Sequence, residues 1–234
     1  MVAVLATTLV VAAAVQGLVG LGLGLIAAPM TMLLEPDLMP DLMLWFGMVY
    51  PMATLIREHH DIEWRGLGWS LAARVPGTAL GVALVTTVSV AVLGVLVGVI
   101  VLLAVALTWR AVVIPVNRGT LLAAGLTSGI TGTATSIGGP PLAVLLQHRA
   151  PHQIRSTLAV YFMIGGALSL AGLYLTGHGE PTVALVSLAL LPCLGAGLLV
   201  SHVLKGIVPR RQVRLAMLTV CALSAVALIT RSLS

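Results

Sequence analysis

Charged residues are scarce in this sequence. Asp, Glu, Lys and Arg make up only 8% of its 234 residues, whereas 59% are hydrophobic; a soluble domain carries roughly a quarter charged residues. This composition excludes a water-soluble fold. Lys and Arg are also missing before the first apolar run, so the positive region that opens a cleavable signal peptide is not there. We therefore expect the first apolar segment to remain in the mature protein.

Patterns that would indicate an enzyme or a nucleic-acid-binding protein are missing as well. The sequence contains no GxxxxGK[ST] nucleotide-binding loop and no recognised motif that pairs a nucleophilic Ser with a His. Residues His59, His60, Asp61 and Glu63 have metal-ligand side chains, but their spacing matches no recognised metal site, and a solvated loop explains them better. The formal net charge of +5 is spread over short loops. We expect no enzymatic activity, metal, cofactor or nucleic-acid partner.

Long apolar segments recur along the whole chain. A helix needs roughly 20 such residues to cross the hydrocarbon core of a bilayer, and these segments lack the apolar/polar alternation of barrel strands. The sequence therefore predicts an all-α integral membrane protein that has the lipid bilayer as a partner. The expected segments are residues 1–34, 38–56, 66–88, 89–109, 120–147, 156–177, 182–204 and 215–230. The uncharged run over residues 75–109 is too long for one typical span, so we expect a turn within residues 86–89.

The second half of the sequence repeats the first. An ungapped shift of 116 residues aligns glycine, proline and aromatic landmarks: Gly22 with Gly138, Phe46 with Phe162, Pro76 with Pro192, and Gly81 with Gly197. We interpret residues 1–116 and residues 117–234 as two membrane repeats. Each consists of a long first segment, which Gly and Pro interrupt, and three further transmembrane helices.

The positive charges predict how the two repeats are oriented. Lys and Arg collect in four loops, at residues 57–65, 110–118, 149–155 and 205–214, and only Arg74 and Arg231 lie elsewhere. Positive residues favour the cytoplasmic side. All four loops share that side only if the first segment of each repeat is re-entrant or crosses twice. We therefore predict inverted repeats, a recurring plan of secondary transporters, with both termini outside. A topology that ignores the charge bias is the alternative.

The two interruptions are the candidate substrate site. Residues 17–29 and 129–141 read GLVGLGLGLIAAP and GITGTATSIGGPP, in which Gly permits unusual backbone conformations and Pro removes an amide donor. Non-helical backbone at membrane depth is tolerated where it lines a cavity, and such paired interruptions point to a transporter's substrate site. Exposed amides and positive helix ends there would attract an anion. The alternative is that these small residues only allow close helix packing.

The two interrupted segments also carry a family resemblance. Residues 16–29, QGLVGLGLGLIAAP, and residues 125–146, GLTSGITGTATSIGGPPLAVLL, resemble the paired glycine-rich signatures of the sulfite exporter (TauE/SafE-type) family, also called the toluene sulfonate uptake permease family. Residues 152–170 resemble the sequence that follows the second signature there. The resemblance implies a permease or exporter of the bacterial cytoplasmic (inner) membrane. It also implies that the substrate is sulfite, an organosulfonate such as sulfoacetate, or another small sulfur-containing anion.

We predict a secondary transporter that binds its anion at the two interruptions, near mid-membrane. The candidate substrate-binding residues are Gln16, Gly20, Gly22, Gly24, Arg74, Thr133, Thr135, Ser136, Gly138, Gly139 and Pro140. Arg74 lies inside an apolar segment, where an ionisable side chain usually faces a cavity or a partner, although an Arg near a helix end can instead extend to the interface. Protons are a candidate coupling ion. A passive anion channel and an intramembrane enzyme are the alternative functions, and no particular oligomeric state is indicated.

Overall fold

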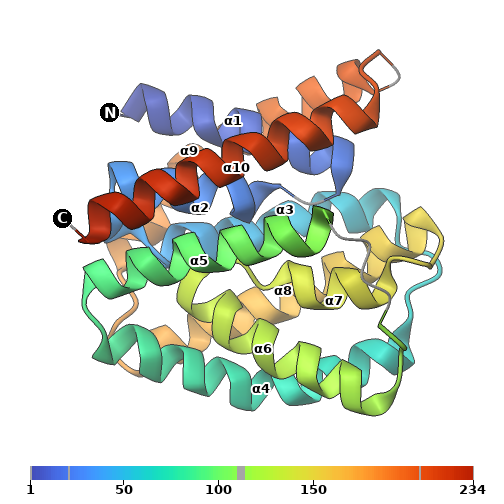
Figure 1. The fold of residues 1–234 in the computed structure, drawn as a ribbon, viewed down its shortest axis with the longest axis horizontal. Coiled ribbons are helices and arrows are strands. Elements are labelled where there is room, and N and C mark those ends of the chain that lie inside the picture. The colour runs from blue at the N-terminus through green and yellow to red at the C-terminus, as the bar shows by residue number, and fades with distance from the viewer. Residues whose placement is uncertain (1, 21, 110–113, 206, 234) are drawn as a thin grey trace.

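The computed structural model describes residues 2–20, 22–109, 114–205 and 207–233. Within these ranges the chain forms ten α-helices and one 3₁₀ helix, and no strand, as the ribbon in Figure 1 shows. The prediction of an all-α protein is therefore confirmed. Four of the described helical stretches are long and apolar enough to cross a membrane: Val90–Leu107, Pro151–Leu175, Pro181–Leu204 and Gln212–Leu233.

The helices follow one another through short connections. The first half of the chain forms α1 (Val2–Val19), α2 (Leu23–Leu34), the 3₁₀ helix η1 (Pro36–Leu38), α3 (Asp41–Arg57), α4 (Trp64–Thr87) and α5 (Val90–Trp109). The second half forms α6 (Arg118–Thr135), α7 (Gly139–Leu146), α8 (Pro151–Leu175), α9 (Pro181–Leu204) and α10 (Arg210–Leu233). The predicted turn within residues 86–89 is confirmed, because α4 and α5 meet at Val88 and Ser89.

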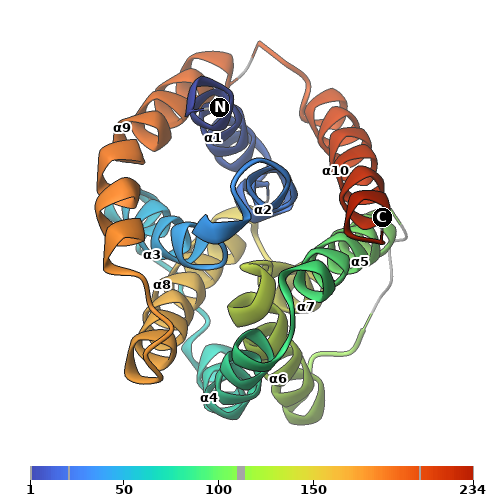
Figure 2. The same ribbon diagram turned by 90° about the vertical axis from the view of Figure 1, so that its left-hand side faces the viewer.

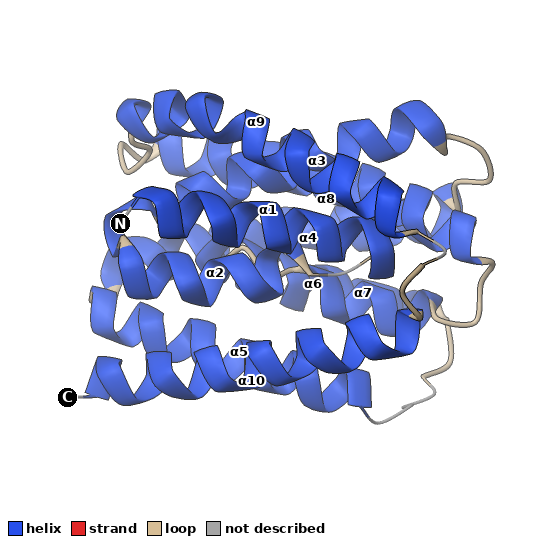
Figure 3. Cartoon of the chain, turned by 90° about the horizontal axis from the view of Figure 1, so that it is seen from above, coloured by secondary structure: helices blue, strands red, loops and turns tan. Residues whose placement is uncertain are grey.

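The connections that carry the positive charges lie together. The helices run roughly along one direction, and the links α3–α4, α5–α6, α7–α8 and α9–α10 all lie at one end of the bundle (Figures 1 and 3). Both termini lie at the opposite end. Arg110, which belongs to the second of these predicted loops, falls outside the described residues. The end that bears the four links is called the basic end below.

Helices from the two halves of the chain pack against each other in pairs. Helix α1 lies along α9, α4 along α6, α3 along α8, and α5 along α10 (Figure 2). The α4–α6 contact is especially close: a Cβ atom added to Gly125 would lie 2.1 Å from the carbonyl oxygen of Ser70, and one added to Gly77 would lie 2.4 Å from that of Leu126. Backbones approach this closely only where side chains are missing. The two halves are therefore interlocked rather than merely adjacent.

Two of these paired helices, α1 and α6, also form helical hairpins with α2 and α7. Helix α1 starts at the end of the bundle that holds both termini and runs toward the basic end. Helix α2 packs on α1 and runs back in the opposite direction (Figures 1 and 3). Helix α6 starts at the basic end, and α7 returns toward it in the same way. Gly22 and Gly138, which lie in the connections of the two hairpins, are buried.

Candidate functional site

The break between α1 and α2 is held by one side chain. Gly20 has φ +89°, in the left-handed region that favours glycine, so the chain leaves the helical path there. The Gln16 side chain spans the break, because its Nε2 donates to the carbonyl oxygen of Gly20 at 3.1 Å and its Oε1 accepts the amide of Leu23 at 3.0 Å. A single amide side chain thus fixes both sides of the break.

The break between α6 and α7 is held by hydroxyl groups. Ser136 ends α6 with φ +59°, and it occupies the position equivalent to Gly20 under the shift of 116 residues. Thr131 Oγ1 donates to the carbonyl oxygen of Ile137 at 3.1 Å, and Ser128 Oγ donates to that of Gly138. The carbonyl groups freed by the break are in this way satisfied within α6.

The two breaks approach each other closely. A Cβ atom added to Gly24, in the first turn of α2, would lie 2.9 Å from the carbonyl oxygen of Ser136. The first amides of a helix have no partner inside it, so those of Gly24 and Leu25 in α2 and of Gly139 in α7 remain for other acceptors. Pro140 and Pro141 supply no amide, so α2 offers more donors than α7.

A cavity of about 70 Å³ lies where the breaks meet, and we call it the tip cavity. Its lining includes six residues that the sequence predicted: Gln16, Gly22, Gly24, Ser136, Gly139 and Pro140. Helices α3 and α8 contribute Met43, Gly47, Tyr50, Pro51 and Phe162. The sequence analysis assigned none of these five residues to the site, although Phe162 is a landmark of the repeat and Pro51 lies within a predicted span.

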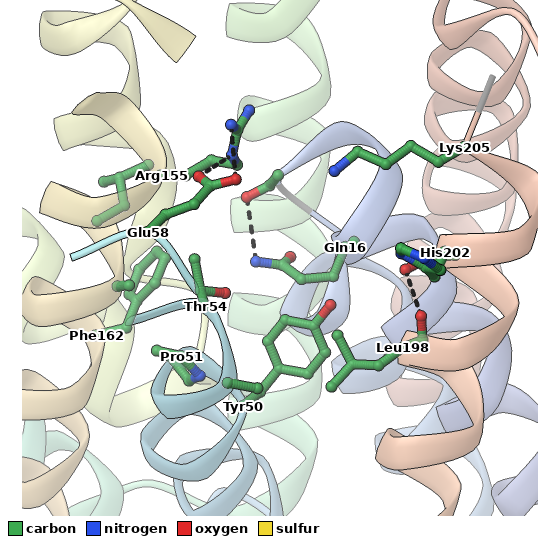
Figure 4. Close-up of a pocket in the computed structure, with 16 residues that line it drawn as sticks. Gln16, Tyr50, Pro51, Thr54, Glu58, Arg155, Phe162, Leu198, His202 and Lys205 are labelled. Carbon is green, nitrogen blue, oxygen red and sulfur yellow. Dashed lines mark hydrogen bonds and ion pairs between the residues drawn. The ribbon is translucent and has the colours of Figure 1, made fainter. Parts of the chain in front are cut away.

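A second cavity of about 90 Å³, the mouth cavity, lies between the tip cavity and the basic end (Figure 4). Its lining includes Gly20, Thr54, Glu58, Arg155, Ser201, His202 and Lys205. Four residues, Gln16, Tyr50, Pro51 and Phe162, line both cavities. The two cavities are therefore neighbours, one lined by residues near the basic end and the other by residues of both breaks. Sequence reasoning did not find the charged residues of the mouth cavity.

Arg74, in α4, contacts α6 and α8 beside the second break, and it does not line either cavity. It is buried, with 3% of its surface exposed, and its guanidinium carbon lies 4.5 Å from the centre of the Tyr161 ring. Its Nη1 donates to Ser128 Oγ at 3.2 Å, and Ser128 in turn donates to the carbonyl oxygen of Gly138. Arg74 is thus connected to the break through Ser128.

Three further predicted residues also lie outside the two cavities. Thr133 Oγ1 is 2.8 Å from Ser169 Oγ in the interior between α6 and α8, and Thr135 Oγ1 donates to the carbonyl oxygen of its own helix at Thr131. A Cβ atom added to Gly138 would lie 2.9 Å from the carbonyl oxygen of Ser128. The structure therefore gives these residues contacts inside the protein, and substrate binding by them stays a prediction.

Comparison with known proteins identifies the family. No curated protein and no solved structure matches the chain. The model of the sulfite exporter TauE/SafE family matches residues 5–228, which include both breaks and both cavities. The predictions of family membership and of a protein that is not an enzyme are confirmed, because this is a family of transporters. Since the match covers nearly the whole chain, and helices long enough to span a membrane are present, the protein is a multi-pass membrane protein that belongs to the sulfite exporter TauE/SafE family.

Proposed function

We propose that the protein is a secondary transporter that moves sulfite or a small organosulfonate, such as sulfoacetate, through the tip cavity. The observation that carries this proposal is the convergence of two helix amino termini, those of α2 and α7, on one cavity. Both helix ends present a partial positive charge and free amides toward it. The mouth cavity then provides the route from the basic end.

A sulfur oxyanion fits the chemistry of the tip cavity. The described residues that line it are all uncharged, so an anion there would meet no repelling carboxylate. Each hydrogen bond to a charged acceptor contributes about 1.5–3 kcal/mol, and amides from Gly24, Leu25 and Gly139 together with the Gln16 amide can supply several. In this proposal Gln16, Gly24 and Gly139 contact the anion, Ser136 shapes the cavity, and Arg74 acts through Ser128.

The proposal includes an arrangement of residues 1–116 and 117–234 as inverted repeats. The pairing of α1 with α9 and of α4 with α6 supports it, because these are equivalent helix pairs under the shift of 116 residues. So does the left-handed backbone at both Gly20 and Ser136. Positive loops favour the cytoplasm, so the basic end faces the cytoplasm of a bacterial cell and both termini face outward.

Transport by purified protein in liposomes tests the function. Uptake of sulfite, sulfoacetate, an aryl sulfonate and sulfate should be measured over a range of concentrations, with and without a proton gradient. The proposal expects flux of sulfite or a sulfonate that saturates and that a proton gradient changes. Flux that rises linearly with concentration would indicate a passive channel, and no flux of any sulfur anion would contradict the proposal.

Single cysteines test the orientation. Cysteines introduced at His59 and His178, which lie in exposed links at opposite ends of the bundle, should be labelled by a membrane-impermeant thiol reagent from opposite sides. A cysteine at Asn117, which is at the basic end, should behave like the one at His59. Labelling of positions 59 and 117 from different sides would contradict the orientation.

A further inference from the structure

The mouth cavity contains an ion pair between two helices. Glu58 caps the carboxyl end of α3, and Arg155 lies in the first part of α8. Arg155 Nε donates to Glu58 Oε2 at 2.6 Å and Nη2 donates to Oε1 at 2.9 Å, so the carboxylate occupies two donors of the guanidinium group. Both side chains are 29% exposed, and they line the cavity above Gln16 in Figure 4.

The position of this pair places the cation of Arg155 next to the first break. Its Cγ would lie 3.8 Å from a Cβ atom added to Gly20, so the side chain lies against the first break. Lys205, at the end of α9, lines the same cavity. An anion that moves from the basic end toward Gln16 therefore passes the guanidinium group of Arg155.

The chemistry of the pair suggests that another anion can take the place of the Glu58 carboxylate, so that the pair does not close the mouth cavity permanently. A guanidinium group binds the paired oxygens of a carboxylate, phosphate or similar oxyanion through two parallel hydrogen bonds. A sulfonate or sulfite offers such oxygens as well. Because the pair is partly solvated, the cost of separating it is moderate compared with that of a fully buried pair.

We infer that Glu58 is an internal competitor for the substrate: the entering oxyanion displaces the Glu58 carboxylate from Arg155 and binds there before it reaches the tip cavity. This inference rests on the proposed function, since it names the residue that receives the transported anion. It makes Arg155 a substrate-binding residue and Glu58 a residue that sets selectivity. Anions that present two oxygens to Arg155 replace the carboxylate well, and single-atom anions such as chloride replace it poorly.

A double-mutant cycle tests the competition. The variants are Glu58→Gln, Arg155→Gln and the double variant, and the first readout is the half-saturation concentration for sulfoacetate uptake into liposomes. The second readout needs no transport: it is the rate at which a cysteine at Thr54, in the mouth cavity, reacts with a sulfonate-bearing methanethiosulfonate. A neutral methanethiosulfonate corrects for access, and the protein without the added cysteine gives the background.

The expected result is strong coupling between the two positions. Glu58→Gln should lower the half-saturation concentration about tenfold, because it frees a charged donor pair. Arg155→Gln should raise it about tenfold in the Glu58→Gln background and at most about threefold in the parent, where Arg155 is already occupied. The modification rate by the anionic reagent should change with the same coupling.

A hydrogen-bonded contact between two other side chains at the basic end provides the control. His152 Nε2 and Asp61 Oδ2 are 3.1 Å apart, and both side chains are mostly exposed and line neither cavity. The cycle of Asp61→Asn and His152→Gln should leave both readouts unchanged. If Arg155→Gln prevents membrane insertion, Arg155→Lys takes its place and should show the same coupling in reduced form, since it keeps the charge but loses the paired donors.

The outcomes separate this inference from the proposed function. Equal losses on Arg155→Gln in both backgrounds, or a higher half-saturation concentration in Glu58→Gln, would overturn the competition even if the parent transports sulfonates. Should the parent transport no sulfur anion while the modification rates still show the coupling, the proposed function fails and the competition at Arg155 stands. Additive modification rates would overturn the competition in that case too.

Discussion

The break between α1 and α2 and the break between α6 and α7 share a backbone form but differ in their support. Both turn through a left-handed residue, Gly20 in one and Ser136 in the other. The Gln16 side chain bridges the first break, next to the mouth cavity. The second break is held by Ser128 and Thr131, and Ser128 is itself bonded to a buried arginine.

This difference indicates that the two breaks have different roles in the site. The second break belongs to α6, whose backbone packs tightly on α4, so a shift there would disturb buried polar groups as well as close helix contacts. The first break depends on hydrogen bonds that water in the adjoining cavity can replace. We therefore interpret the second break as the fixed wall of the site and the first as the wall that adapts to the anion.

The largest expected effect comes from the point where the two breaks touch. Gly24→Val would place a Cβ atom 2.9 Å from the carbonyl oxygen of Ser136, so the breaks would have to separate and the tip cavity would change shape. We expect loss of sulfite or sulfoacetate uptake, measured in liposomes at equal protein content. Gly195→Val is the control, because a Cβ atom there meets open space. Unchanged uptake in Gly24→Val would refute the site.

The next effect concerns the support of the second break. Ser128→Ala removes the acceptor of Arg74 and the donor to the Gly138 carbonyl group, and both partners are buried. The free energy of unfolding, measured by denaturant titration in detergent, should fall by about 1–3 kcal/mol. The control Thr127→Val, whose hydroxyl group is exposed and bonds only within α6, should change it little.

Variants of Arg74 also test the support of the second break. Arg74→Gln should also lower the stability of the protein and weaken sulfoacetate uptake, and Arg74→Lys should retain part of the uptake without the stacking on Tyr161. Because Arg74 acts on the break through Ser128, the double variant with Ser128→Ala should cost less than the sum of the two single losses. Strictly additive losses would show that Arg74 reaches the anion by another route.

A smaller effect is expected at the first break. Gln16→Leu removes two hydrogen bonds across the break, but water from the cavities can reach the freed groups. The half-saturation concentration for sulfoacetate should rise about fivefold, with little loss of stability. Gln212→Leu, at an exposed position in the first turn of α10 and outside both cavities, is the control. A larger loss of stability in Gln16→Leu than in Ser128→Ala would reverse the assignment of fixed and adaptable walls.

The smallest effect is expected for a hydroxyl group outside both cavities. Thr133→Val removes a contact with Ser169 in the protein interior, so it should change the half-saturation concentration by no more than about twofold while it lowers stability. Ser136→Ala removes a hydroxyl group that donates to the Pro40 carbonyl oxygen at 3.1 Å beside the tip cavity. Because this bond helps to shape the cavity, its loss should raise the half-saturation concentration by about threefold or more. The reverse order would place the anion against the interior face of α6.

Local signals in the sequence carry the prediction of the interrupted segments, and they say less about the rest of the site. Glycine and proline act on their own backbone, so interruptions within residues 17–29 and 129–141 could be predicted locally. The turn at Val88 and Ser89 was predicted from the length of the uncharged run over residues 75–109. The placement of the four positive loops on one side was expected from the positive-inside bias, which required the first segment of each repeat to be re-entrant or to cross twice. Membership in the family was visible in the same glycine-rich segments.

The side chains around the breaks could not be predicted in the same way. Glu58 and Arg155 are 97 residues apart and meet only because α3 packs on α8. Arg74 was expected to bind the anion. Its position against Ser128 of α6 depends on the close approach of α4 to α6, which glycines such as Gly77 and Gly125 permit. Uniformly apolar helices show no polar face that would indicate which side chains point inward.

The pairing of α1 with α9 has a consequence for how the chain is made. When α1 leaves the ribosome, its partner does not yet exist, since about 160 residues separate Val19 from Pro181 and synthesis at ~5–20 residues per second needs roughly 10–30 s to add them. During that time the face of α1 that holds Leu9, Ala12 and Ala13, fully buried in the finished protein, has only lipid or insertion machinery beside it. Because α1 carries no charged residue, lipid can surround its whole surface until α9 has been synthesised.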